Sequence, residues 1–302
     1  MLISVIIPTR NRSQSLAALL ESLNGIKLAP GIAVEFIVIN NASTDNTAEM
    51  LKARAAKSSQ TSLRVFEEAA PGKSRALNRA LTEARGDLLM IIDDDVIVDP
   101  NCIAKHIEAH EQTDFAAIQG RVLPGKDPDG RSADPQRLRE YNIPIIDHGH
   151  DRKAIRGVIG TNMSFKRGVL ETIGGFDERL GPGAAGFSED TEFSIRMRQA
   201  GFKIGYIPDA IGYHELNPNR YGRAYNRDME FRKGLSRSLY RRDSIAFSVL
   251  PNLFANCLRW LCYRALGLTQ KAYKTEGRVL KCAGYLVGKY RARANRRAGA
   301  AQ

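Results

Sequence analysis

The amino-acid sequence predicts an α/β fold in which a mostly parallel sheet is covered by helices on both faces. Two observations support this prediction. Along the first two-thirds of the chain, short apolar runs alternate with segments whose apolar residues recur at helical spacing. The apolar runs are continuous, as at residues 88–92, which is typical of strands buried on both faces. A chain of 302 residues suits one large domain, or one domain with an appendage.

Six segments are predicted to be strands because each is a short run rich in apolar residues. These strands are expected at residues 4–7, 34–39, 62–66, 88–92, 115–120 and 203–207. Helices are expected at residues 13–23, in the segment that ends at 56, and at 73–84, 100–110, 167–173 and 188–200. Ser43 or Thr44 is expected to cap the second helix by accepting from its free amide hydrogens.

The remaining segments of this part of the chain are less regular. Residues 124–152 are rich in Pro, Gly, Asp and Arg and predict a long loop. Regular structure is expected to resume at residues 158–165. Residues 174–186 hold five glycines among thirteen residues and predict a glycine-rich loop before the last helix.

Three adjacent carboxylates, Asp93, Asp94 and Asp95, directly follow the apolar run at 88–92. The C-terminal end of a parallel strand lies at the edge of the sheet where open α/β folds bind ligands. Adjacent like charges repel, so a hard divalent ion such as Mg²⁺ or Mn²⁺, which prefers oxygen ligands, is one expected partner. The alternative is an acidic turn before the next helix, with Asp99 as its capping residue.

The net charge of +12 is unevenly distributed along the chain. Residues 1–218 hold 26 Lys and Arg against 29 Asp and Glu, whereas residues 219–302 hold 19 against 4. This contrast predicts a first domain at 1–218 and a basic extension at 219–302.

Four cysteines without metal-ligand spacing indicate a reduced, cytoplasmic chain. The N-terminus leads directly into a predicted strand, which argues against secretion. No uninterrupted apolar stretch approaches the ~18–20 residues that a membrane-spanning helix needs.

Six motifs occur in an order and at spacings that resemble the family 2 glycosyltransferases, a large inverting family with the nucleotide-binding fold called GT-A. The motifs lie at Val5–Arg12, Ile37–Asp45, Gly72–Asn78, Gly86–Asp95, Gly174–Asp177 and Glu189–Asp190. Together they span roughly residues 1–215. Each motif alone is weak, but six in order are hard to obtain by chance. The resemblance implies an enzyme that transfers a sugar from a nucleotide-sugar.

The resemblance assigns donor-binding roles to residues near the predicted acidic edge. Asp93 and Asp95 match the family's DxD acids, the first near the ribose and the last on a Mn²⁺ or Mg²⁺ ion that bridges the diphosphate. Such an ion stabilises the negative charge that builds on the leaving group. The other residues implied to contact the nucleotide-sugar are Pro8, Thr9, Arg12, Asn41, Arg75 and Asp94.

The acceptor side is implied by the Glu189–Asp190 pair. In the family the second acid is the catalytic base, so Asp190 would take the proton of the acceptor hydroxyl while Glu189 helps to position the acceptor. Asn162 lies in the segment that matches the floor of the acceptor site. The alternative for Asp190 is a purely structural one, in which an acid in the first turn favours the helix dipole.

Three histidines leave alternatives open. His214 matches a position that in some relatives supplies a further metal ligand, although a lone histidine is more often structural. His106 and His110 have the i, i+4 spacing of a metal pair, but without a third ligand we expect them on a solvated helix face.

Two departures from the family pattern limit the assignment. Many relatives carry an acid that contacts uracil where this chain has Asn40 and Asn41. An Asn amide can still bond a base edge, so a UDP-sugar is the default donor. The chain also lacks the Gln-x-x-Arg-Trp motif of processive synthases, which favours transfer of a single sugar.

The basic extension predicts a second partner. Apolar residues recur at helical spacing from Leu250 to Leu268, with basic residues on both flanks. A basic amphipathic helix suits an anionic membrane surface, so residues 237–297 are expected to touch the cytoplasmic face of the inner membrane peripherally. The alternative is a helix that packs its stripe on the first domain. Nucleic acid is a rival partner that we do not favour.

These inferences converge on an inverting glycosyltransferase that adds a sugar to a saccharide or lipid-linked acceptor in cell-envelope or exopolysaccharide synthesis. One rival is a sugar-phosphate nucleotidyltransferase, which also uses an α/β sheet, acids and a metal. That class is expected to carry a glycine-rich loop after the first strand, and Pro8–Arg12 has no glycine. The other rival is a binding protein on a degenerate transferase fold, which the intact acids disfavour.

Overall fold

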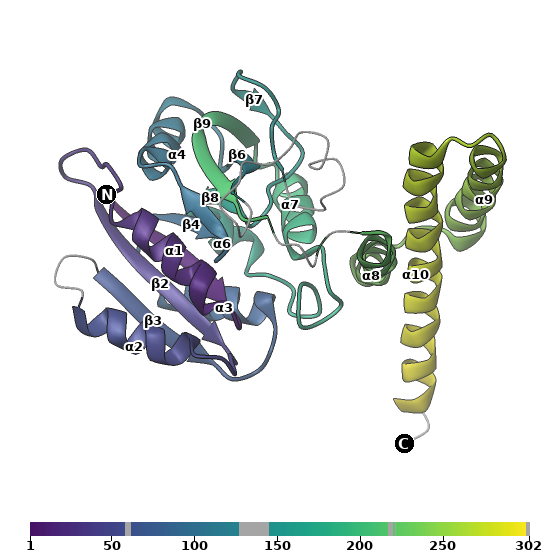
Figure 1. Cartoon of the computed structure of the whole chain (residues 1–302), viewed down its shortest axis with the longest axis horizontal. Coiled ribbons are helices and arrows are strands. Elements are labelled where there is room, and N and C mark those ends of the chain that lie inside the picture. The colour runs from purple at the N-terminus through teal and green to yellow at the C-terminus, as the bar shows by residue number, and fades with distance from the viewer. Residues whose placement is uncertain (58–61, 127–144, 217–219, 221, 300–302) are drawn as a thin grey trace. The chain divides into compact units, whose positions relative to one another are not determined.

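The computed structural model describes the chain except for residues 58–61, 127–144, 217–219, 221 and 300–302. The chain divides into two compact units (Figure 1). Unit 1 comprises Met1–Glu178 and Glu189–Pro218, and unit 2 comprises Arg179–Ser188 and Asn219–Gln302. Unit 2 therefore includes residues 179–188, which the charge distribution placed in the first domain.

Unit 1 is built on a nine-stranded sheet in the order β3-β2-β1-β4-β8-β6-β9-β5, with β7 paired to β9. The strands are β1 Leu2–Thr9, β2 Ala33–Asn41, β3 Ser62–Glu68, β4 Leu88–Ile92, β5 Val96–Val98, β6 Ala117–Pro124, β7 Lys153–Ala154, β8 Asn162–Lys166 and β9 Ile204–His214. The first four of the order run parallel, and β8 is antiparallel to both β4 and β6. The predicted α/β class with a mostly parallel sheet is thus confirmed.

Helices cover both faces of this sheet (Figure 1). They are α1 Ser13–Leu23, α2 Thr47–Lys57, α3 Lys73–Glu83, α4 Cys102–Gln112, α6 Arg167–Ile173 and α7 Glu189–Gln199. Successive residues of each central strand point to opposite faces, so Ile7 packs with the leucines of α1 while Ile6 packs with α3. Because both faces are buried, most residues of these strands are apolar, which explains the continuous apolar runs; Ser4 in β1 is an exception that bonds Glu35 at 2.6 Å.

The structure changes the bounds of one predicted strand and adds two others. Strand β9 extends to His214, beyond the expected end at 207, because it continues past Pro208 through a bulge opposite Gly120 and Arg121. Strands β5 and β7 were not predicted, and the strand expected within 158–165 is β8. The loop predicted at 124–152 falls largely outside the described residues.

The start of α2 also differs from the prediction. Asp45 Oδ1 accepts from the Thr47 amide at 3.1 Å, so Asp45 caps this helix. Ser43 and Thr44 instead bond Asn11 of the loop after β1, at 3.0 Å to its amide and 2.6 Å to its side-chain oxygen. These contacts join the loops that follow β1 and β2.

Unit 2 contains α8 Arg223–Tyr240, a π-helical turn η2 Ile245–Val249, α9 Leu250–Ala265 and α10 Thr269–Gly299. Helices α8 and α10 pack closely because glycines lie at their crossing. A Cβ atom on Gly284 would lie 2.0 Å from the Phe231 carbonyl oxygen, and one on Gly234 would lie 2.1 Å from the Lys281 carbonyl oxygen. Only glycine permits this approach.

By length and composition, one helix among the described residues could cross a membrane, Ile245–Ala265. The sequence analysis expected no such segment. Only 11% of its most apolar window is buried within the structure, so it is not a core helix.

Candidate functional site

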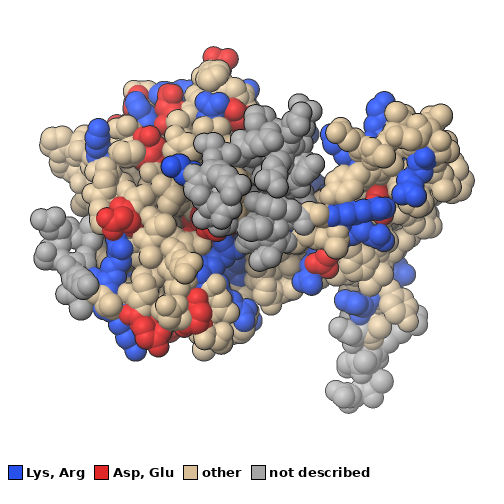
Figure 2. Space-filling view, in the orientation of Figure 1, with Lys and Arg blue, Asp and Glu red and all other residues tan. Residues whose placement is uncertain are grey.

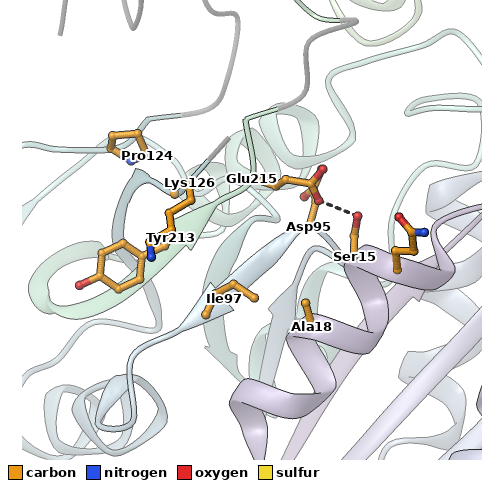
Figure 3. A pocket seen from close by; sticks show the side chains of 10 residues that line it. Ser15, Ala18, Asp95, Ile97, Pro124, Lys126, Tyr213 and Glu215 are labelled. Atoms are coloured by element: carbon orange, nitrogen blue, oxygen red, sulfur yellow. Dashed lines mark hydrogen bonds between the residues drawn. The ribbon is translucent and has the colours of Figure 1, made fainter. Parts of the chain in front are cut away.

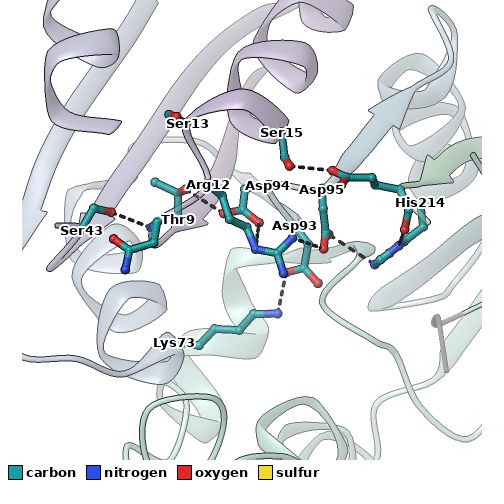
Figure 4. Close-up of polar contacts among 12 residues, drawn as sticks. Thr9, Arg12, Ser13, Ser15, Ser43, Lys73, Asp93, Asp94, Asp95 and His214 are labelled. Atoms are coloured by element: carbon teal, nitrogen blue, oxygen red, sulfur yellow. Dashed lines mark hydrogen bonds and ion pairs between the residues drawn. The ribbon is translucent and has the colours of Figure 1, made fainter. Parts of the chain in front are cut away.

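The three acids Asp93–Asp95 follow β4 at the point where the sheet changes direction. One neighbour of β4 is the parallel strand β1, and the other is the antiparallel strand β8. The acids therefore meet side chains from different elements (Figure 4). The Thr9 hydroxyl donates to Asp94 at 2.7 Å, and an Arg12 guanidinium nitrogen lies 2.6 Å from Asp95. The predicted grouping of Thr9, Arg12 and the acids is present.

The loop between β1 and α1 presents Arg12 to these acids. Asn11 adopts a left-handed conformation with φ +53, which Asn tolerates better than most residues, and its side chain is held by Thr44. Burial alone would lower the pKa of Arg12, but Asp95 and Asp94 raise it above its usual value. Burial together with the nearby Asp95 raises the pKa of Asp94 to about 7, against the lowering effect of Arg12.

The predicted metal residues Asp95 and His214 lie together. His214 Nε2 is 3.3 Å from Asp95 Oδ1, and both side chains are buried. Nδ1 of His214 lies 2.8 Å from the Glu215 carbonyl oxygen, which can only accept, so Nδ1 carries the ring proton. With the proton on Nδ1, the lone pair of Nε2 points toward the Asp95 carboxylate. The nitrogen and the carboxylate oxygen could then bind one metal cation together.

Within the described part of the chain, no group of three or more His, Cys, Asp and Glu side chains is arranged to hold a metal. Two protein ligands fit a Mg²⁺ or Mn²⁺ ion that completes its shell with substrate phosphates and water, as such ions commonly do. A divalent ion on Asp95 would compete with the ion pair to Arg12.

Lys73, which the sequence analysis did not single out, connects the two halves of the site. It is the first residue of α3, and its ammonium group contacts Asp93 and lies 3.7 Å from Glu189 Oε1. Burial would lower the pKa of Lys73, but Asp93 and Glu189 outweigh it and raise that pKa. A lysine at the first position of a helix opposes the helix dipole, and this was the available signal of an acidic partner.

The predicted acceptor acids begin α7. Burial and the neighbouring Asp190 raise the pKa of Glu189 to about 7, although Lys73 opposes this. Burial also raises the pKa of Asp190, whose Oδ1 accepts from the Thr191 amide at 2.6 Å. A buried acid beside a partly buried one, both with raised pKa values, is typical of groups that bind or move protons.

Two predicted ligand contacts, Asn41 and Asn162, have protein partners instead. Asn41 donates to the Ala70 carbonyl oxygen at 2.8 Å and accepts from the Gly72 amide at 2.8 Å. Asn162 is fully buried and donates to the Ala210 carbonyl oxygen at 2.9 Å. We interpret both as residues that hold the backbone around the site.

The other two predicted nucleotide residues also have definite positions. Pro8 is buried near the end of β1. Arg75 is half-exposed on α3, where it pairs with Glu178 at 3.2 Å.

The prediction of a solvated face for His106 and His110 is wrong. Both imidazoles are buried between α4 and β8, where they share the Ser164 hydroxyl at 2.8 Å each. His106 Nε2 also lies 3.0 Å from Asn162 Oδ1. They form a polar network in the core and no metal pair.

A cavity of about 850 Å³ opens beside Asp95 (Figure 3). It is lined by Gln14, Ser15, Ala18, Asp95, Ile97, Pro124, Gly125, Lys126, Tyr213 and Glu215. The Ser15 hydroxyl donates to Glu215 at 2.6 Å across one wall. The acid predicted to hold the metal therefore faces a space large enough for a small-molecule ligand.

Comparisons with known proteins identify the family of this chain. The model of the family "Glycosyl transferase family 2" matches residues 4–174. The chain is 30% identical to uncharacterized glycosyltransferase YfnE of Bacillus subtilis, over 72% of this chain and 65% of YfnE, so it spans just under two-thirds of that relative. It is 24% identical to O-antigen chain rhamnosyltransferase RfbN of Salmonella typhimurium, over 72% of this chain and 67% of RfbN.

Among solved structures, the mannosyltransferase PcManGT from Pyrobaculum calidifontis, in complex with GDP-Man and Mn²⁺, covers 94% of this chain. The match spans 86% of PcManGT with a TM-score of 0.64 at 20% identity, which shows a shared fold. The family model matches more than half of the chain, and the fold and the acidic edge agree with it. The chain therefore belongs to glycosyl transferase family 2.

Proposed function

We propose that this protein is a metal-dependent inverting glycosyltransferase that moves a single sugar from a nucleotide-sugar to a saccharide or lipid-linked acceptor. One observation carries the proposal: Lys73 joins Asp93, at the donor end of the site, to Glu189, at the acceptor end. A site for group transfer needs both ends within reach of each other. The names of the relatives, among them an O-antigen chain rhamnosyltransferase, support a role in cell-envelope or exopolysaccharide synthesis.

The donor end is assigned to the residues around β4. Asp95 and His214 would hold a Mn²⁺ or Mg²⁺ ion, which stabilises negative charge on a departing diphosphate. Asp93, Asp94 and Thr9 line the same edge and are proposed to position the nucleotide. Arg12 and Arg75 supply positive charge for the nucleotide-sugar. UDP is the default nucleotide.

The acceptor end is assigned to α7. Asp190 would take the proton of the acceptor hydroxyl while the hydroxyl oxygen forms a bond to the anomeric carbon. The bond from that carbon to the diphosphate breaks on the opposite face, and the electron pair leaves with the diphosphate. This single displacement inverts the anomeric centre. Burial raises the pKa of Asp190, which makes it a stronger base than an exposed aspartate.

The two rival functions differ in their products. A sugar-phosphate nucleotidyltransferase would release pyrophosphate when it makes a nucleotide-sugar, whereas a glycosyltransferase releases a nucleoside diphosphate. A binding protein on the same fold would release neither. We propose a cytoplasmic location with a peripheral membrane contact through residues 237–297, since lipid-linked acceptors lie at a membrane.

The first test is a thermal-shift screen of nucleoside diphosphates and nucleotide-sugars, each with and without Mn²⁺ or Mg²⁺. A ligand at 100 times its dissociation constant should stabilise the fold by about 2.7 kcal/mol. We expect a shift that needs both one nucleotide and a metal and that is lost in Asp95→Ala. Asp114→Ala, which removes an exposed acid paired with Lys203, is the matched control. No metal-dependent shift with any nucleotide would refute the assignment.

A further inference from the structure

Helix α9 and the turn before it expose large apolar side chains on one face. We define the apolar stripe as Phe247, Leu250, Phe254, Leu258 and Leu261, which are 90%, 47%, 68%, 48% and 56% exposed. The four α9 residues are spaced at four, four and three positions, so they lie on one side of the helix. In α1, by contrast, all four leucines of the helix face are buried.

The opposite face of α9 is the one that packs within unit 2. The only fully buried residue of the helix is Asn256, and its side chain donates to the Asn252 carbonyl oxygen at 2.7 Å. The other residues of this face are apolar and partly buried: Leu253, Cys257, Trp260 and Tyr263. An amphipathic helix in water exposes its polar face. Helix α9 instead exposes a second apolar face, which is expected when that face meets another apolar phase.

Basic side chains flank the stripe. Arg264 lies next to the stripe on α9 and Arg259 lies on the far side of the helix; both are exposed, as are Lys271 and Lys274 at the start of α10. Residues 219–302 hold 19 Lys and Arg against 4 Asp and Glu. In Figure 2 the surface of residues 219–302 is mostly uncharged and carries separate patches of Lys and Arg. Apolar side chains bordered by cations complement a bilayer with anionic headgroups.

We propose that α9 lies in the surface of an anionic phospholipid membrane, with the apolar stripe at the acyl boundary and the basic side chains around it among the headgroups. The sharpest claim concerns orientation: the helix lies along the surface and does not span the bilayer. A spanning position of Ile245–Ala265 would place Asn256 and Arg259 within the hydrocarbon, which is costly for polar and charged groups. This inference concerns unit 2 and does not depend on the proposed glycosyltransferase activity.

Two other occupants fit the observations less well. A second copy of the chain would bring two strongly basic surfaces together, and like charges across an interface are repulsive. Nucleic acid would engage the arginines, but single-stranded nucleic acid uses aromatic stacking rather than leucine side chains. An anionic membrane surface would contact both the apolar and the basic residues of α9.

The test is flotation of the full chain with vesicles of phosphatidylcholine alone or with 30% phosphatidylglycerol. Phe254→Ser with Leu261→Ser should lower the partition coefficient by about 100-fold or more, because each residue loses the burial of a large side chain. Tyr290→Ser is the matched control, since Tyr290 is 74% exposed on α10 outside the stripe, and it should stay within twofold of the parent. Phe247→Ser, at a residue 90% exposed, tests the stripe without risk to folding.

The charge component is tested separately. Arg259→Gln and Arg264→Gln should each weaken binding to the anionic vesicles about fivefold, which corresponds to ~1 kcal/mol per basic residue, and should change binding to neutral vesicles little. Added salt should weaken the binding of the parent protein to anionic vesicles.

Four results would overturn the proposal. The first two are the absence of vesicle binding in the parent, and equal vesicle binding by the parent and the stripe variants. The stripe variants could instead dissociate a dimer or destabilise the protein in the absence of vesicles, which would mean that the stripe packs on protein. Resistance of the bound protein to alkaline carbonate would indicate a spanning helix. The nucleotide and metal thermal shift, measured on the same variants, shows whether the catalytic assignment stands or falls independently.

Discussion

The buried histidine pair makes a quantitative prediction about acid stability. Burial lowers the pKa of His106 to about 4, and burial together with the neighbouring His106 lowers that of His110 to about 3, from an ordinary value of 6.5. Between pH 6.5 and the lowered values, the unfolded chain binds protons that the folded chain does not. Stability is therefore fully present above pH 6.5 and is lost as the pH falls toward 4.

The size of this loss follows from the same pKa values. A pH of 5 lies 1.5 units below the ordinary pKa of histidine, so both histidines are protonated in the unfolded chain, while the folded imidazoles remain neutral. At 1.36 kcal/mol per unit, each histidine should cost about 2 kcal/mol between pH 7 and pH 5, and the pair about 4 kcal/mol. A protein of ordinary stability would lose a large part of its free energy of unfolding.

The assay is urea unfolding at pH 7 and pH 5 of the parent and of His106→Gln with His110→Gln. Glutamine keeps hydrogen-bonding capacity but does not titrate, so the variant should lose about 4 kcal/mol less than the parent between these two pH values. The comparison is needed because burial raises the pKa of Asp94 and Glu189 to about 7, and their proton uptake stabilises the folded state in acid. His148→Gln, at an exposed histidine, should behave as the parent. An equal pH dependence in the parent and the double variant would refute the reasoning.

Three further predictions concern the site and unit 2. Asp190→Asn should lower kcat by about 10²–10⁴-fold while the thermal shift with nucleotide and metal persists; a loss below tenfold in a turnover assay would exclude a catalytic base there. Lys73→Met should lower the free energy of unfolding by about 3 kcal/mol at pH 8, because two carboxylates lose their shared cation, and by less at pH 5, where Glu189, with a pKa of about 7, binds a proton; a pH-independent loss would contradict this. Gly284→Ala should destabilise unit 2 by about 1–3 kcal/mol, since the added Cβ meets the Phe231 carbonyl oxygen at 2.0 Å, whereas Gly168→Ala, with no atom within 4 Å, should not lower the melting temperature.

Much of the parallel half of the sheet could be predicted because its signals are local. The runs that became β1 and β4 are continuous and apolar, and α1 has the predicted bounds, Ser13–Leu23, since four leucines mark its buried face. The acids after β4 could be placed for the same reason: the end of a buried parallel strand lies at a sheet edge.

The other half depends on contacts between distant parts of the chain. Strand β5 is only three residues long, and it exists because Val96–Val98 pairs with Gly212–His214. No local pattern marks such a strand. Strand β9 contains Pro208, and a proline in the sequence predicts the end of a strand. The strand continues because a bulge opposite Gly120 accommodates the proline.

The site shows the same division. Asp95, Arg12 and Glu189 were identified from motifs, but the i, i+4 spacing of His106 and His110 is the same on a solvated face and on a buried one. Burial is decided by β8, whose Ser164 lies more than fifty residues away in sequence. The amphipathic pattern of α9 likewise predicted a helix with an apolar face, but it did not show that several of these apolar residues would remain exposed.

The acids at this edge also bear on the proposed donor. Asp93–Asp95, Glu189 and Asp190 bring five carboxylates together, and Arg12 and Lys73 form ion pairs with some of them. The raised pKa values of Asp94 and Glu189, about 7 each, arise in part from the neighbouring acids Asp95 and Asp190. Crowded carboxylates would repel a bare diphosphate but favour one that arrives with a divalent cation, because the cation satisfies the acids and the phosphates together. This charge pattern supports the proposal that the donor binds together with its metal.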